Sequence, residues 1–98
     1  MEKIMQVKAQ AELRENAWQN TRGENMIIAS VELELTDGLD TIVAEVTGDD
    51  ARALAANPAV PGTTGYFALR FGVSEVKTRD GKPFKTMRCR VQAFSLYR

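Results

Sequence analysis

The sequence contains no histidine and only one cysteine, Cys89, among its 98 residues. Most zinc sites need several Cys or His ligands, and most nucleophile–base pairs use His as the base. The GxGxxG, P-loop and GxSxG patterns are also missing. These absences exclude the commonest zinc, nucleotide-binding and hydrolase sites. We therefore expect a protein that is not an enzyme and that needs no cofactor.

Long apolar runs are missing as well. No run approaches the ~18 apolar residues of a membrane helix. The opening MEKIMQVKAQ has no apolar core of the ~7–15 residues found in a signal peptide. A lone cysteine has no partner for an internal disulfide, as is usual in a reducing compartment. We expect one cytoplasmic domain spanning residues 1–98, with no membrane partner.

The formal net charge is zero, but the two signs are unevenly distributed. Residues 1–62 carry five basic side chains against eleven acidic ones, a balance of −6. Residues 63–98 carry eight basic side chains against two acidic ones, a balance of +6. Such asymmetry predicts a basic surface that binds a polyanion. Charge pairing between the two parts of the chain is the alternative interpretation.

Five segments alternate apolar and polar residues, which is the repeat of a β-strand that buries one face. The apolar sets run from Met5 to Leu13, Ile27 to Leu35, Ile42 to Val46, Phe67 to Val73 and Met87 to Ala93. We expect every set to face a common core, with Phe71, Val73 and Met87 included.

Three connections separate these strands. Residues Glu15–Glu24 form a polar loop with one large aromatic, Trp18. Residues Asp49–Asn57 combine acids at the start with good helix formers, and prolines follow, so this segment is expected to be a short helix. The third connection, KTRDGKPFK, contains Asp80-Gly81, a strong hairpin signal.

The last hairpin allows a prediction of register. Both of its apolar sets are odd-numbered, so a two-residue turn would expose one of them. We therefore expect a connection of odd length, or a bulge, with Gly72 as the candidate position. A three- or five-residue connection would place Phe71 opposite Val91 and Gly72 opposite Arg90.

The expected order is three strands, a short helix and two strands in about 100 residues. This is the order of an OB-fold, a five-stranded Greek-key barrel. We expect an all-β OB-fold with the helix between the third and fourth strands. An SH3-like barrel and a small α+β sheet share this order and are the alternatives.

The stretch Gly65–Phe94, GYFALRFGVSEVKTRDGKPFKTMRCRVQAF, resembles the last hairpin of the single-stranded-DNA-binding OB-fold proteins of bacteria, plasmids and phages. In its short length the chain also looks like the primosomal OB proteins. The resemblance implies non-catalytic binding of single-stranded DNA, largely without sequence preference, in replication, repair or recombination. It also implies a homodimer or homotetramer.

Single-strand binders combine a basic groove for phosphates with aromatic side chains on which bases stack. Acids on the second and third strands, such as Glu32 and Glu45, would repel phosphate, so we expect binding at the loops and the last hairpin. We expect Arg70, Arg88 and Arg90 to share one outward face, which suits a phosphate path along the sheet. The expected contacts are Trp18, Arg22, Arg70, Lys77, Arg79, Lys82, Phe84, Lys85, Arg88 and Arg90.

Several alternatives remain at this point. Trp18 and Phe84 could pack in the barrel instead of stacking, and the basic loop could be a solvated hairpin. A protein–protein assembly module and a single-stranded RNA binder are the alternative functions.

Overall fold

Six strands and one short helix make up the computed structural model. It describes residues 1–77 and 79–98, except for the side chains of residues 18, 74, 76 and 77. The elements are β1 (Glu2–Gln10), β2 (Arg14–Gln19), β3 (Asn25–Thr36), β4 (Thr41–Thr47), α1 (Asp49–Ala56), β5 (Thr64–Lys77) and β6 (Pro83–Leu96).

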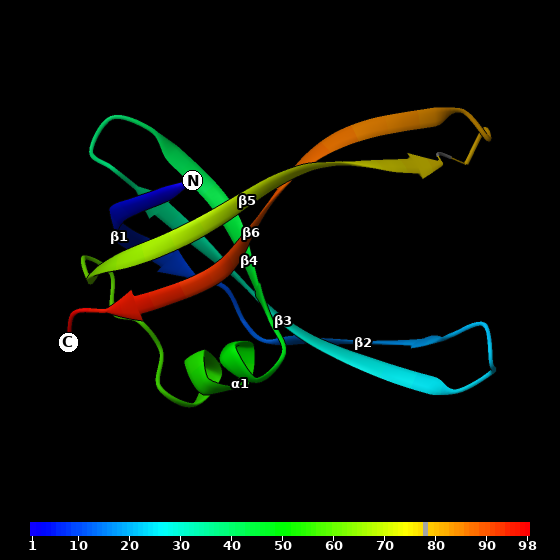
Figure 1. The fold of residues 1–98 in the computed structure, drawn as a ribbon, viewed down its shortest axis with the longest axis horizontal. Coiled ribbons are helices and arrows are strands. Elements are labelled where there is room, and N and C mark those ends of the chain that lie inside the picture. The colour runs from blue at the N-terminus through cyan, green and yellow to red at the C-terminus, as the bar shows by residue number, and fades with distance from the viewer. Residues whose placement is uncertain (78) are drawn as a thin grey trace.

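Five of the strands close into a barrel, in the order β1-β5-β6-β4-β3 and back to β1. The β4–β6 pair is parallel and the other pairs are antiparallel. With α1 between β4 and β5, the expected five-stranded barrel with one short helix is confirmed. Figure 1 shows the barrel at the left, with α1 below it.

Alternating side chains fill the barrel, as the period of two predicts. Phe67 is fully buried, and its ring stacks on that of Phe94 with centroids 6.2 Å apart. The other most deeply buried side chains are Val7, Val31, Leu33, Leu35, Val46, Leu54 and Leu69. Leu54 belongs to α1, so the helix covers part of the core. No helix in the described part of the chain is long and apolar enough to cross a membrane.

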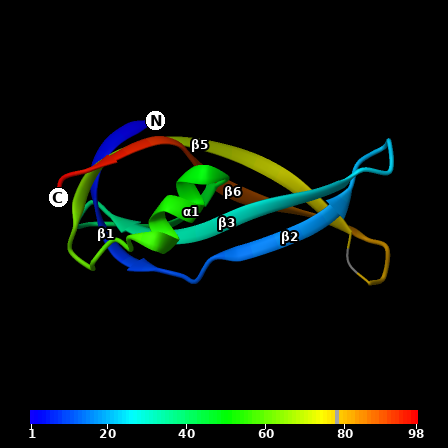
Figure 2. The same cartoon turned by 90° about the horizontal axis from the view of Figure 1, so that it is seen from below.

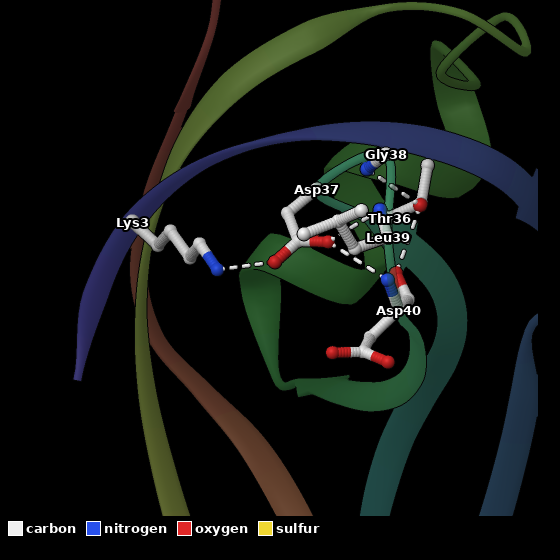
Figure 3. A network of polar contacts seen from close by, with 6 residues as sticks. All are labelled: Lys3, Thr36, Asp37, Gly38, Leu39 and Asp40. Carbon is white, nitrogen blue, oxygen red and sulfur yellow. Dashed lines mark hydrogen bonds and ion pairs between the residues drawn. The ribbon is translucent and has the colours of Figure 1, made fainter.

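The turn between β3 and β4 is held by a polar network (Figure 3). The Asp37 carboxylate accepts hydrogen bonds from the backbone N–H groups of Leu39 and Asp40, each at 2.9 Å. The ammonium group of Lys3, on β1, forms an ion pair with the same carboxylate. These contacts join the turn to the first strand of the barrel.

Two arms, each of two strands, project from the same end of the barrel (Figures 1 and 2). One arm is β2 with the first half of β3, and the other is the second half of β5 with the first half of β6. The prediction that Glu15–Glu24 is a loop is therefore wrong for its first half, because residues 15–19 belong to β2. Arg14–Gln19 pairs residue by residue with Asn25–Ser30.

The turn of this first arm shows why a polar segment forms a hairpin. The backbone N–H groups of Arg22 and Glu24 donate to the side-chain oxygen of Asn20, at 2.9 and 3.0 Å. Gly23 has a φ of 78°, which a side chain would disfavour. Local polar contacts thus set the hairpin, and no apolar pattern is needed.

The β5–β6 register differs from the predicted one. Lys77 pairs with Pro83, so the connection is residues 78–82, and the expected odd length is confirmed. However, Phe71 lies opposite Cys89, and Gly72 lies opposite Arg88, a shift of two residues.

A bulge is present, but it lies at Gln92 instead of Gly72. The pairs Ala68–Ala93 and Leu69–Val91 leave Gln92 without a counterpart. Beyond the bulge the inward positions of β6 are even-numbered, so that Phe94 packs against the core. The odd-length connection thus places the two odd-numbered apolar sets on one face of the arm, and the bulge turns the even-numbered Phe94 and Leu96 toward the core of the barrel.

The expectation that each apolar set is buried throughout is also wrong. Phe67 and Leu69 are 0% and 1% exposed, but Phe71 is 44% exposed and Val73 is 67% exposed. Met87, opposite Val73, is 71% exposed. These residues continue the core face into the arm, where the barrel no longer covers it.

Candidate nucleic-acid interface

Three arginines lie together on the arm formed by β5 and β6. Arg70 is opposite Arg90, and Gly72 is opposite Arg88. Since side chains alternate between faces, the three arginines share one face, as the sequence predicts. All three are exposed, and among the described residues none has an acid within ion-pair distance. No ion pair in this part of the chain neutralises them, and Glu45 on β4 is the parallel neighbour of Arg90.

The three arginines line a shallow hollow that also reaches the end of β4. Thr47 and Gln92 add a hydroxyl and an amide to its polar lining. Every charged residue lining this hollow is basic. Arginine binds phosphate oxygens in a bidentate manner, so the hollow is suited to a phosphate group.

Phe84 extends this surface toward the tip of the arm. It occupies an even position of β6, as Arg88 and Arg90 do, and no bulge intervenes. Its ring is 55% exposed. Positions two apart on a strand are about 7 Å apart, so an aromatic ring and two guanidinium groups follow one line. We call Arg70, Arg88, Arg90 and Phe84 the basic face.

A second hollow adjoins the first and shares Arg88 and Arg90 with it. Its other charged residues are Arg14 on β2 and two acids, Glu32 and Glu45. The acids predicted to disfavour phosphate on these strands do line this hollow. The mixed charge makes it less favourable for an anion than the first hollow.

Arg14 was missed as a site residue by reasoning from the sequence. It begins β2, opposite Ser30, and so comes to the same hollow as Arg88. Only recognition of β2 as a strand beside β3 would have revealed this. Cys89 lies in the same hollow, and burial raises the pKa of its thiol, which therefore stays protonated near neutral pH.

The other predicted contacts lie away from the basic face. Arg22 is exposed at the turn of the first arm, and Arg79 and Lys82 are exposed in the connection of the second. Lys85 is on the opposite face of its arm, paired with Glu75.

Two predicted contacts fall on side chains outside the described part of the structure. The backbones of Trp18 and Lys77 lie in β2 and β5. The stacking role of Trp18 and the phosphate contact of Lys77 remain predictions.

The sequence matches no known family model and no curated protein. Function is therefore inferred from the geometry of the basic face.

Proposed function

We propose that the protein binds single-stranded DNA without catalysing a reaction, through phosphate contacts and base stacking. The observation that carries this proposal is the hollow in which Arg70, Arg88 and Arg90 converge without an acid in its lining. A polyanion would supply the negative charge that the lining of this hollow lacks.

A single strand suits this surface better than a duplex does. Phe84 is exposed in line with the arginines, and a single strand leaves its bases free to stack on such a ring. In a duplex the bases are already stacked on one another. Contacts to phosphate carry no sequence information, so binding is largely independent of sequence. Replication, repair and recombination are the processes that expose such strands.

The proposal also includes self-association in the cytoplasm, as a dimer or tetramer. The exposed apolar residues Phe71, Val73 and Met87 support it, because contiguous apolar surface favours association. Their positions on the two strands alternate with those of the arginines, although Val73 also lines the hollow of the arginines and Met87 lines the second hollow.

The salt dependence of binding tests the role of the basic face. Each phosphate contact to a single strand contributes about −0.7 to the slope of log K against log salt concentration. With a labelled oligo-dT, Arg88→Ala and Arg90→Ala should each weaken binding and flatten the slope by about 0.7. Lys8→Ala, at an exposed position of β1 in the barrel, is the control and should leave the slope unchanged.

Two further ligands make the experiment decisive. Oligo-dT should bind more tightly than heparin, since heparin offers charge without bases that stack. Equal affinity for heparin, or equal slopes for all variants, would refute the proposal. Tighter binding of oligo-U than of oligo-dT would instead indicate an RNA partner.

A further inference from the structure

Gly72 lies in the middle of the basic face, on β5. It is opposite Arg88, and two residues along the strand from Arg70. A glycine inside a strand weakens it, since it has no side chain to pack and loses more conformational freedom on folding. Three physical causes can favour glycine there all the same: a backbone conformation that needs it, a close contact within the protein, or a ligand that approaches the backbone.

The backbone conformation does not require this glycine. The glycines with positive φ are Gly23, Gly38, Gly48, Gly62 and Gly81, and Gly72 is not among them. The bulge of this hairpin lies between the pairs of Ala68 and Leu69, so Gly72 pairs regularly. An L-residue therefore fits the backbone at position 72 without strain.

Close packing does not require it either. A Cβ atom built on Gly65 would lie 2.8 Å from the carbonyl oxygen of Ser95, so Gly65 is needed for the fold. A Cβ atom built on Gly72 would meet nothing within 4 Å among the described atoms. Of the seven glycines, Gly72 alone has neither a positive φ nor a close neighbour. The cause that is left is a ligand that comes close to the backbone.

The surroundings of Gly72 indicate what that ligand is. Gly72 lines the hollow together with Arg70, Arg88 and Arg90, which offer guanidinium donors around a position with no side chain. We propose that the sugar–phosphate backbone of a bound single strand crosses the arm at Gly72, with its phosphates held by the flanking arginines. This inference rests on the proposed function and adds the place and the chemical part of the strand that makes the contact.

Substitution at Gly72 separates a role in binding from a role in the fold. Gly72→Ala and Gly72→Val place increasing bulk in open space, and valine favours strands, so stability should be unchanged or higher. Oligo-dT binding should weaken with side-chain size, and Gly72→Val should flatten the salt slope by about 0.7 to 1.4, the contribution of one or two phosphates. Ala17→Val adds bulk at an exposed position of the other arm and should change neither quantity.

An abasic oligonucleotide identifies the part of the strand that is close to Gly72. If the sugar–phosphate backbone crosses there, Gly72→Val should reduce the affinity for the abasic strand and the affinity for oligo-dT by similar factors. A loss confined to oligo-dT would mean that a base occupies the position, and would overturn the inference. So would lower stability of Gly72→Ala, or wild-type affinity in Gly72→Val. If the wild-type protein fails to bind oligo-dT, the proposed function itself fails.

Discussion

Arg70 and Arg90 lie directly opposite each other on β5 and β6, so two like charges share one exposed face. Like charges at directly opposed positions destabilise an antiparallel pair. Among the described residues, neither guanidinium group has an acid within ion-pair distance to offset this repulsion. The repulsion between the two charges therefore disfavours the fold, whereas a bound phosphate would be attracted by both charges.

Replacing Arg70 should accordingly stabilise the protein while it weakens binding. Arg70→Thr removes the repulsion and introduces a residue that favours strands. Its free energy of unfolding in urea should rise by about 0.2–1 kcal/mol. The gain should shrink at high salt, where the repulsion is screened. Arg79→Thr, in the connection at the tip of the arm, is the control and should not be stabilised. A loss of both stability and affinity in Arg70→Thr would contradict this account.

Much of the fold could be predicted because the alternation of apolar and polar residues along a strand shows which of its two faces is buried. The period of two correctly placed Ala29, Val31, Leu33 and Leu35 in the core. It also placed Arg70, Arg88 and Arg90 on one outward face. Whether a position is odd or even decides which face its side chain occupies, and a register error of two residues does not change that face. The helix at Asp49–Ala56 followed from its acids and its prolines.

The same alternation does not show where the barrel ends, because the apolar pattern continues from the barrel into the arm. Phe71 and Val73 continue the pattern of Phe67 and Leu69, but they lie in the arm, beyond the strands that cover the core. The strand β2 has only a weak pattern of its own, since it is set by pairing with β3 and by the turn at Asn20. The contribution of Arg14 to the site depends on that pairing and was missed for the same reason.

A half-buried amide provides a test of how the helix is held to the barrel. The Gln10 side chain, at the end of β1, donates to the carbonyl oxygen of Leu54 at 3.0 Å and accepts from the N–H of Ala59 at 2.9 Å. Gln10→Ala leaves both groups without this partner and should cost about 1–3 kcal/mol of unfolding free energy in urea. Gln6→Ala, at an exposed position of the same strand, should cost less. Equal losses of unfolding free energy in the two variants would show that these two hydrogen bonds do not stabilise the fold.

The Asp37 turn makes a prediction about acid stability. The N–H of Asp40, the ammonium of Lys3 and the N–H of Leu39, in that order, hold the pKa of the Asp37 carboxyl well below its usual range. A carboxyl with a lowered pKa in the folded state stabilises that state above its unfolded pKa of about 3.9. This contribution is lost as the pH falls toward the folded-state pKa.

Asp37→Asn should therefore be less stable than the wild-type protein at neutral pH, and the difference should narrow as the pH falls from about 4 to about 2. Urea unfolding across this range measures the difference. Lys3→Ala removes one of the three donors and should reproduce part of the loss. A constant difference between wild type and Asp37→Asn at all pH values would exclude this role for the turn.

Substitutions of Trp18 distinguish a protein that binds nucleic acid from one that binds another protein. Its backbone lies in β2, opposite Met26, in an arm of only two strands outside the closed barrel. We expect Trp18→Ala to change stability by less than about 1 kcal/mol and to lose roughly 1–3 kcal/mol of affinity for oligo-dT, the value of one base stacked on an aromatic ring. If the tryptophan filled the core, its replacement by alanine would instead cost about 3–5 kcal/mol of stability.

Trp18→Phe should recover part of the affinity because a smaller ring still stacks, whereas Trp18→Lys should keep the attraction of charge without stacking. If Trp18→Ala unfolds the protein, or binds oligo-dT as tightly as wild type, the stacking role is wrong and an assembly module becomes the better interpretation.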